Sequence, residues 1–545
     1  MNFDNFLANI YFGSLDMERF HSFRDLEEND KTREIIEKYH EITEKYPSSY
    51  LEEQGTVPAE LLEALKKMGF FGLNIPEGYG GVGLSIRQYL KVVEVLSISD
   101  LALALISLAH LSIGCKGIVL FGTEAQKAKY LVPAATGEMI FSYALTEPKI
   151  GSDAKHIETW ATLSDDGSYY ILNGQKTYIT NANYAGGLTV FAQLDRDKPG
   201  FMGAFIVETA WEGVKIGRDM PKMGLKASST AAIEFKDVRV PVENLLGKPG
   251  DGFKIAMTIL NYGRVALGAG SAGALHQSSS DMEKQSARRI QFGVPINTFE
   301  LIQEKIVKAK VDGYVTSAIT AFTAGLLEND PLAPVAIESS HCKLFGTTRA
   351  WDTIYNALQV AGGSGYLATQ PYEKRMRDFR VTTIFEGTTE IHSIYPPLFI
   401  LRNLDKEIKA AHLSTMSKLA FLLKGFFARA KWKLKFNKRV MNRAVRVAKA
   451  NARSIRLLLL VGLLIHGKRI QKKQFFLRRL TNLSLYLLGI LSVLAKIDAK
   501  QKMGRDVSED QKILAYFVEE ALQVRKNNTR LIRSKKEALH KKIFQ

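Results

Sequence analysis

Three short segments of the chain combine hydroxyl groups, aromatic rings and a carboxylate with turn-forming residues. Hydroxyl groups supply hydrogen bonds for a polar ligand, and a carboxylate in dry surroundings can act as a base. For the pair Glu386-Gly387 taken alone, a solvated glutamate before a glycine turn is the more common explanation. The three segments are FSYALTEPKIGSDA (141–154), NGQKTYITNA (173–182) and TIFEGTTEI (383–391).

Two other sequences, at 78–83 and 268–273, fit the dinucleotide-binding pattern G-x-G-x-x-G. That pattern needs a strand directly before its first glycine. Pro76 spoils a central strand before the first sequence. The second lies in a run of small residues that predicts a closely packed helix. The chain has no Walker A pattern, no H-E-x-x-H and only two cysteines, so we expect no metal site.

The order of the three segments resembles that of the acyl-CoA dehydrogenase flavoprotein family, and the resemblance runs from about residue 25 to residue 402. Residues 100–137, the opening around Phe12-Gly13 and a long tail further resemble the very-long-chain branch, which has a C-terminal helical extension. The resemblance implies an FAD-dependent enzyme of fatty acid β-oxidation. Its substrate would be a long- or very-long-chain fatty acyl-CoA, and its product trans-2-enoyl-CoA.

This reaction needs a base for the α-proton, and it needs donors that polarise the thioester carbonyl. The base should be a carboxylate whose pKa rises when the substrate expels water. The resemblance assigns this role to Glu386 and implies that FAD N5 accepts the hydride. In some branches the base instead precedes the arginine that corresponds to Arg264. That position is Gly263 here, so no second carboxylate competes.

The resemblance also implies which residues bind FAD. Tyr143, Thr146, Tyr178 and Thr180 would face the isoalloxazine ring, although simple β-propensity also explains the two threonines. A second set would contact the FAD of a neighbouring subunit or the adenosine-diphosphate end: Arg289, Gln291, Phe292, Gln359, Gly362, Gly363, Thr388 and Glu390. Contacts from two subunits imply a homodimer or a higher homo-oligomer.

For the substrate, Ser152 and Arg264 match family positions that hold the CoA moiety. A charge inside an otherwise small and apolar helix is costly unless it is paired, so a structural salt bridge is the alternative for Arg264. Residues 101–114 carry no charge apart from His110 and are expected to line the acyl end. An electron-transfer flavoprotein is the expected electron acceptor.

The elements that must position these residues follow from periodicity and turn signals. Helices are predicted at 34–44 and 58–68, and as a buried pair over 90–120 that breaks near Asp100 and Gly114. The apolar stretches of that pair are shorter than the roughly 20 residues of a bilayer span. Four strands, bounded by turn pairs such as Asn173-Gly174, are predicted at 169–172, 188–193, 204–207 and 231–235.

The predicted architecture is an N-terminal helical domain, a central antiparallel β-domain and a C-terminal helical bundle, as in acyl-CoA dehydrogenases, followed by a basic all-helical extension. The predicted boundaries are an N-terminal arm at 1–24, the helical domain at 25–142, the β-domain at 143–248, the bundle with the catalytic base at 249–402, and the extension at 403–545.

Charge is distributed unevenly along the 545 residues, whose net charge is +18. Residues 401–545 contain 35 Lys and Arg but only 9 Asp and Glu, whereas residues 1–400 have a net charge of −8. Such asymmetry indicates an anionic partner for the tail.

Residues 413–440 predict an amphipathic helix with an apolar stripe beside dense Lys and Arg. This pattern suits the surface of an anionic membrane, and a domain helix with a solvated charged face is the alternative. Nucleic acid is not expected, because 457–465 and 480–494 predict buried helices and no groove-reading motif is present. Both apolar runs are shorter than a bilayer span.

The opening residues MNFDNFLANI have neither a signal-peptide nor a transit-peptide composition. A cytoplasmic protein, peripheral to the inner face of the membrane, is therefore expected. Two alternative functions remain: an assembly or scaffold protein that has kept the fold, and an acyl-CoA oxidase, since access of O2 cannot be inferred from sequence.

Overall fold

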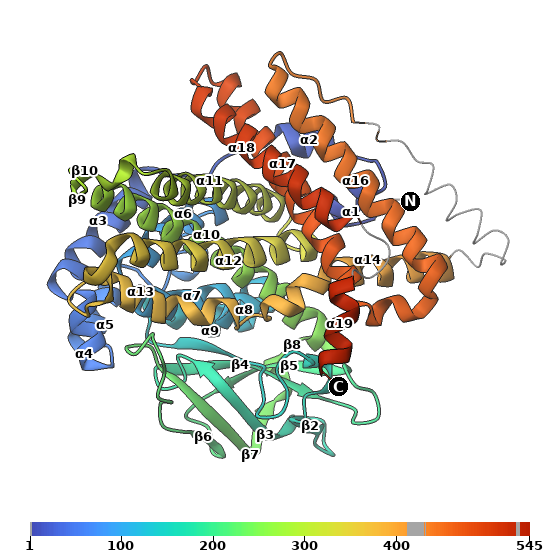
Figure 1. Ribbon diagram of the computed structural model, residues 1–545. Coiled ribbons are helices and arrows are strands. Elements are labelled where there is room, and N and C mark those ends of the chain that lie inside the picture. Colours follow the sequence, from blue (N-terminus) through green and yellow to red (C-terminus); the bar gives the residue numbers. More distant parts are fainter. Residues whose placement is uncertain (1–2, 411–429, 431, 530–534, 545) are drawn as a thin grey trace. The chain divides into compact units, whose positions relative to one another are not determined.

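The computed structural model describes residues 3–410, 430, 432–529 and 535–544. Its contacts divide the chain into two compact units. The first unit consists of Met1–Asp25, Val307–Thr348 and Gly387–Gln545, and the second of Leu26–Ile306 and Arg349–Glu386. Figure 1 shows the elements of both, and the predicted order of helices, strands, helices and further helices is confirmed.

The second unit begins with helices that cover one another's apolar faces. The predicted break near Asp100 is confirmed, because Asp100 caps the following helix and accepts a hydrogen bond from Leu103 N–H at 2.9 Å. Gly114 ends a π-helical turn, where a Cβ atom would lie 2.7 Å from the Phe141 carbonyl oxygen. The elements are α3 (Asp30–Lys45), α4 (Ser48–Gln54), α5 (Ala59–Lys67), α6 (Ile86–Ser99), α7 (Leu101–Leu108), η2 (Ala109–Gly114), α8 (Lys116–Phe121) and α9 (Glu124–Thr136).

His110 connects this helical layer to the first strand. Its Nδ1 accepts a hydrogen bond from Phe141 N–H at 2.9 Å, and its Nε2 lies 3.1 Å from the carbonyl oxygens of Phe71 and Ala134. Burial lowers the pKa of His110 to about 4. The one titratable group in the predicted acyl-lining segment is therefore neutral at pH 7 and structural.

All four predicted strands are found in an eight-stranded sheet with the order β6-β7-β3-β2-β4-β5-β8, in which β1 pairs with β4. Most neighbours are antiparallel, as predicted, but β1 and β2 each run parallel to β4. Thr189 Oγ1 donates to the Gly114 carbonyl oxygen at 2.7 Å and ties the sheet to η2. The strands are β1 (Ile140–Ala144), β2 (Trp160–Leu163), β3 (Tyr169–Thr180), β4 (Ala185–Gln193), β5 (Met202–Glu208), β6 (Val214–Ile216), β7 (Thr230–Pro241) and β8 (Leu245–Gly250).

After the sheet, the long helix α10 (Gly252–Arg288) contains the second G-x-G-x-x-G sequence, and the first lies in the 3-10 turn and loop between α5 and α6. Neither sequence follows a strand, so neither is a dinucleotide loop. The unit is completed by the hairpin β9 (Ile290–Gln291) and β10 (Val294–Pro295), the C-terminal half of α12 (Ala336–Ala361), η6 (Gly362–Tyr366), α13 (Pro371–Phe379) and η7 (Arg380–Thr383).

In the first unit the N-terminal arm packs with the C-terminal helices. Tyr11 is 1% exposed and its hydroxyl bonds Ser484, while Phe6 packs on Phe322 with ring centroids 5.1 Å apart. The elements are α1 (Phe6–Tyr11), α2 (Met17–His21), most of α11 (Glu300–Asn329), the N-terminal half of α12, α14 (Thr389–Ala410), α16 (Arg439–His466), η8 (Gly467–Lys472), α17 (Gln474–Lys502), α18 (Ser508–Asn528) and α19 (Lys535–Phe544).

The two predicted apolar runs of the tail lie in α16 and α17, so both helices are confirmed. The expectation of apolar runs too short for a bilayer is wrong by length for 90–120 and 480–494, but not for 457–465 in α16. Leu101–Phe121 and Gln474–Lys502 are both long and apolar enough to span one. However, 78% and 94% of their apolar windows are buried in the structure. Burial of this extent is what core helices show.

The helix predicted over 413–440 falls mostly outside the described residues, which omit 411–429 and 431. Its predicted end is wrong, because residues 432–438 are not helical and α16 begins at Arg439. Trp432 and Leu434 are buried, whereas Lys433 and Lys435 are exposed. This alternation has the period of an extended segment. In the sequence, the same lysines looked like the charged face of a helix.

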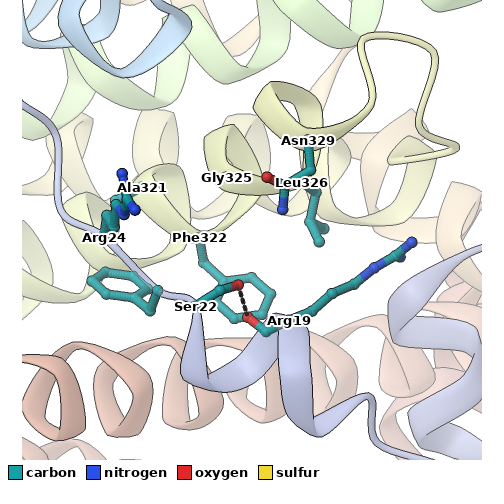
Figure 2. Close-up of a pocket in the computed structure, with 9 residues that line it drawn as sticks. Arg19, Ser22, Arg24, Ala321, Phe322, Gly325, Leu326 and Asn329 are labelled. Atoms are coloured by element: carbon teal, nitrogen blue, oxygen red, sulfur yellow. Dashed lines mark hydrogen bonds between the residues drawn. The ribbon is translucent and has the colours of Figure 1, made fainter.

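A small pocket lies where the arm meets α11 (Figure 2). The Ser22 hydroxyl donates to the Arg19 carbonyl oxygen at 3.1 Å beside it. None of the predicted site residues lines this pocket. Its lining is Arg19, Ser22, Phe23, Arg24, Ala321, Phe322, Gly325, Leu326 and Asn329.

Candidate active site

Glu386 is the last residue of the second unit and has a strained backbone. Its φ angle is +54°, a left-handed conformation that residues other than glycine rarely adopt. Arg264, which is 7% exposed, donates from Nε to the Glu386 carbonyl oxygen at 3.3 Å. α10 therefore helps to hold a conformation of the kind that is typical of functional sites.

The Glu386 carboxylate lies directly over Gly263. A Cβ atom at position 263 would be 2.4 Å from Glu386 Oε1 and 2.6 Å from Oε2. Any side chain at this position would displace the carboxylate. The absence of a side chain at Gly263 thus leaves the space that the Glu386 carboxylate occupies.

Tyr143, predicted to face the flavin, lies near this carboxylate. Its hydroxyl donates to the Ala256 carbonyl oxygen at 3.2 Å. Desolvation raises the pKa of Tyr143 well above its usual value; the Arg264 charge opposes the rise and the Glu386 charge adds to it. The structure therefore brings three predicted residues together: Tyr143, Arg264 and Glu386.

Tyr89 belongs to the same region, although no sequence motif includes it. Its hydroxyl lies 2.9 Å from the Ser112 hydroxyl in η2. Burial raises the pKa of Tyr89, the hydrogen bond to Ser112 opposes the rise, and charges at Cys115 and Glu386 add to it. The position of Tyr89 among the inward-facing residues of α6 could have indicated a buried hydroxyl. No sequence pattern indicated that its partner would be Ser112 in a π-helical turn.

Thr146 and Thr180 lie where β1 and β3 meet. The Thr177 N–H donates to the Thr146 carbonyl oxygen at 2.9 Å, and the Ser142 hydroxyl donates to the Thr180 carbonyl oxygen at 2.8 Å. Both threonines are half-buried. Their side chains can therefore be reached by a ligand at the C-terminal ends of these two strands.

Tyr178 precedes Thr180 at an irregular point of β3, where the register shifts between Lys176 and Ile179. It has a φ of +57° and is 65% exposed. An exposed aromatic ring beside two accessible hydroxyls fits a planar, polar group such as the isoalloxazine of FAD. The residues of the β-domain therefore fit the cofactor.

The residues predicted to reach a neighbouring subunit lie on exposed segments. Arg289, Gln291 and Phe292 are in the β9–β10 hairpin, where Phe292 is 95% exposed. Gln359 lies in the last turn of α12, and Gly362 and Gly363 begin η6, where a Cβ atom at either glycine would meet no atom within 4 Å.

Ser152 lies in the exposed loop after β1, and Arg264 is buried in α10. Besides the Glu386 carbonyl, Arg264 reaches Asn261 Oδ1 at 3.4 Å. The position of Ser152 is open to a large polar ligand such as CoA.

Thr388 and Glu390 belong to the first unit, at the start of α14. Thr388 Oγ1 accepts a hydrogen bond from Ile391 N–H at 3.4 Å, and Glu390 is exposed. The sequence reasoning missed Lys343 of α12, which is fully buried and donates to the Gly387 carbonyl oxygen at 2.5 Å. The peptide that follows Glu386 is thus anchored.

No group of three or more His, Cys, Asp and Glu side chains in the described part of the chain could hold a metal ion. The two cysteines, Cys115 and Cys342, are free and buried. The chemistry of the region around Glu386 is therefore that of a carboxylate, an arginine and tyrosine hydroxyls.

Comparison with known proteins agrees with this geometry. Family models described as acyl-CoA dehydrogenase match three consecutive parts of the chain: the N-terminal domain at 28–138, the middle domain at 142–238 and the C-terminal domain at 250–394. This chain belongs to the acyl-CoA dehydrogenase family. Members of this family are FAD-dependent oxidoreductases that dehydrogenate acyl-CoA, so the resemblance inferred from the three motifs is confirmed.

Individual relatives extend the likeness into the tail. The very long-chain specific acyl-CoA dehydrogenase of Bos taurus is 35% identical over 501 residues, which cover 86% of this chain and 75% of the relative. The short-chain specific acyl-CoA dehydrogenase of Clostridium acetobutylicum is also 35% identical, but over 370 residues that cover 67% of this chain and 96% of the relative.

Among solved structures, the acyl-CoA dehydrogenase from Bacillus anthracis complexed with FAD superposes with a TM-score of 0.82. It is 29% identical, and the match covers 95% of this chain and 90% of that chain. The predicted fold class is confirmed, and the additional C-terminal helices are part of an architecture already seen in a relative.

Proposed function

We propose that this chain oxidises long- or very-long-chain fatty acyl-CoA to trans-2-enoyl-CoA, with FAD as its cofactor and Glu386 as the base. The observation that carries the proposal is the Glu386 carboxylate, which lies over Gly263 on a backbone held by Arg264. FAD, when bound by Tyr143, Thr146, Tyr178 and Thr180, supplies the hydride acceptor for the β-carbon.

In this mechanism the Glu386 carboxylate removes the proton on the α-carbon of the thioester. An acyl chain that enters the site expels water, and a carboxylate that loses its water becomes a stronger base. By family resemblance, the Glu386 N–H donates to the thioester carbonyl and stabilises the charge that develops on its oxygen. Arg264 keeps this peptide in position through the Glu386 carbonyl.

Preference for long chains is supported by two observations. The match to the very-long-chain relative extends further along this chain than the match to the short-chain relative. The segment expected to line the acyl end, α7 and η2, is nearly all buried and carries no charge at pH 7. An apolar lining favours an apolar ligand.

The decisive experiment is anaerobic mixing of the purified protein with acyl-CoAs of graded length while the flavin absorbance is followed. We expect fastest bleaching with long chains. A folded protein that holds no flavin, and regains none when FAD is added, would overturn the proposal in favour of a scaffold role. Reoxidation of the bleached flavin by electron-transfer flavoprotein, but slowly by O2, would distinguish a dehydrogenase from an oxidase.

We further infer a homodimer or a higher homo-oligomer. Ile290, Phe292 and Val294 of the β9–β10 hairpin are 60%, 95% and 39% exposed, an apolar surface that a second copy would cover. Light scattering of the eluted protein should give at least twice the mass of one chain. Phe292→Ser should shift the mass toward one chain, and an unchanged mass would place the contact elsewhere.

We also propose a cytoplasmic location on the inner face of an anionic membrane. Residues 413–440 remain the predicted contact, and α16 adds five Lys and Arg spaced three or four residues apart, with no acid and none of them buried: Arg439, Arg443, Arg446, Lys449 and Arg453. Among described carboxylates, only Glu519 pairs with one of them, Arg443, at 2.5 Å.

Co-sedimentation with vesicles tests this location. Wild type should bind vesicles that contain anionic lipid and should be released by salt, because each basic residue near the surface contributes about 1 kcal/mol. The pair Arg446→Glu and Arg453→Glu should weaken binding, whereas Lys512→Glu and Lys526→Glu, on α18, should weaken it less. Wild type that stays in solution at low salt would contradict the proposal.

A further inference from the structure

The β-domain contains a buried ion pair that the proposed mechanism does not use. Lys176 Nζ lies 2.7 Å from Glu147 Oε1, and the two residues are 0% and 4% exposed. Burying two charges is costly, and an apolar pair of the same size often stabilises a protein equally well. Stability alone therefore does not explain why two charged residues occupy these buried positions.

The Glu147 carboxylate holds two distant backbone segments together. It accepts hydrogen bonds from the N–H groups of Glu158 and Thr159, the latter at 3.0 Å. At the other end, Glu147 and Ile150 exchange backbone hydrogen bonds of 2.9 and 3.1 Å. The carboxylate thus ties Glu147, before the loop 148–157, to Glu158 and Thr159 after it, and the backbone of Glu147 closes a tight turn inside the loop.

Lys176 anchors this arrangement to strand β3. Its Nζ also donates to the Leu145 carbonyl oxygen at 3.1 Å. Burial on its own would raise the pKa of Glu147, but the Lys176 charge and the hydrogen bonds lower it on balance. Burial lowers the pKa of Lys176 to about 8 against the attraction of Glu147. Both groups are therefore charged at pH 7.

The pair lies between two predicted ligand contacts. Thr146 precedes Glu147 in the chain, and its carbonyl oxygen accepts from the N–H of Thr177, which follows Lys176. Ser152 lies within the closed loop. The hydrogen bonds of the pair thus act on the residues predicted to contact the flavin and the CoA moiety.

We propose that Lys176 and Glu147 are positioning residues, which fix Thr146 and the loop 148–157 in the conformation that binds FAD and the CoA thioester. The inference rests on the proposed function, which supplies these two ligands. Neither residue touches the reacting atoms. Loss of the pair should therefore weaken binding and leave the chemical step nearly intact.

The test uses Lys176→Met, which keeps the unbranched side chain up to the position of Cε and removes the charged group. We expect the Kd for FAD, measured by titrating the apoprotein, and the KM for acyl-CoA each to rise about 10- to 100-fold. The rate of flavin bleaching at saturating substrate should change less than about threefold, which is small beside the expected changes in Kd and KM. Hydrogen exchange of the peptides that cover 148–157 should become faster.

Two further variants separate positioning from stability. Lys215→Met removes an exposed lysine of β6, outside the loop, and should leave all four measurements unchanged. Lys176→Met combined with Glu147→Gln removes both buried charges. It should recover the thermal midpoint of wild type while KM and loop exchange stay raised.

Recovery of KM together with the thermal midpoint in the double variant would overturn the inference, since the pair would then contribute only stability. Unchanged FAD affinity and loop exchange in Lys176→Met would overturn it as well. If wild type were not reduced by any acyl-CoA, the proposed function would fail. The FAD titration and the loop exchange would still decide the role of the pair.

Discussion

Glu386 and Gly263 are 123 positions apart in the sequence, yet the carboxylate of one fills the space that a side chain of the other would need. A side chain at position 263 and the Glu386 carboxylate cannot both occupy this space. The strained φ of Glu386 and the hydrogen bond from Arg264 keep the carboxylate in this place. Two predictions at the scale of single residues follow from this arrangement.

Glu386→Gln should keep the fold and the flavin and should still bind acyl-CoA. Flavin bleaching should slow by at least about 100-fold, because general base catalysis contributes that much or more. Anaerobic stopped-flow absorbance measures the effect. Glu212→Gln, an exposed glutamate of the same unit, is the control and should bleach at the wild-type rate. Near-normal bleaching by Glu386→Gln would place the base elsewhere.

Gly263→Ala should also slow bleaching, by about 10- to 100-fold, because the new Cβ atom would lie 2.4 Å from Glu386 Oε1. Binding of acyl-CoA should change little. Gly325→Ala is the matched control, since a Cβ atom at this helical glycine meets no atom within 4 Å. It should raise the free energy of unfolding by about 0.5–1 kcal/mol. Full activity of Gly263→Ala would show that the carboxylate is free to move.

At the scale of elements, the N-terminus of α1 is bound to α12 by one buried carboxylate. Glu338, which is fully buried, accepts from the Asn5 amide at 2.7 Å and from the Leu7 N–H at 2.8 Å. Burial raises the pKa of Glu338 to about 7, although these hydrogen bonds oppose the rise. The contact of the arm with α12 therefore depends on pH.

Between pH 4.5 and 7 the unfolded chain loses the Glu338 proton while the folded chain keeps it. The contribution of Glu338 to the free energy of unfolding should therefore fall as pH rises through this window, by on the order of 3 kcal/mol. His341, whose pKa burial lowers to about 3, contributes with the opposite sign below pH 6.5. Wild type alone would consequently show a mixture of both effects.

The difference between Glu338→Gln and wild type isolates this contribution. Relative to wild type, the variant should become more stable as pH rises from 4.5 to 7, as measured by chemical denaturation across that range. Glu18→Gln, an exposed glutamate of α2, should show no such trend. A constant difference between Glu338→Gln and wild type would contradict a raised pKa.

How far the elements could be predicted depended on whether their signals were local. The break at Asp100 and the four strands were predictable because caps and alternation are encoded within a few residues. The parallel pairing of β1 with β4 and the Tyr89–Ser112 contact depend on residues that are distant in the sequence, so no local sequence pattern predicts them. The prediction that a helix continues through 432–438 was wrong. The many lysines there were read as the charged face of a helix, whereas buried and exposed residues alternate with a period of two.

At the scale of the whole molecule, the first unit is built from both ends of the chain. α1 and α2 pack with helices that come after residue 306, and Leu7 is fully buried among them. The sequence gives no sign of this grouping, because short helices such as α1 carry no signal for their partners. The arm should therefore matter for the stability of the C-terminal helices.

Leu7→Ala should lower the free energy of unfolding of the first unit by about 2–5 kcal/mol, as is usual for a buried leucine. Hydrogen exchange of α17 peptides should become faster, while peptides of β3, in the second unit, should be unaffected. Leu464→Ala, a leucine of α16 that is 61% exposed, should change neither. Unchanged exchange in α17 would show that the arm is dispensable.

Because the first unit combines segments from both ends of the chain, its segments are synthesised at widely separated times. About 400 residues lie between α1 and α16. At ~5–20 residues per second, the ribosome needs roughly 20–80 s to make them. During that interval the apolar side chains of α1 can pack against α11 and α12 but not against α16 or α17, and by its end the second unit has received all of its sequence. α1 is thus made long before its last partners, so the part of its apolar surface that packs on α17 stays uncovered until the C-terminal helices follow.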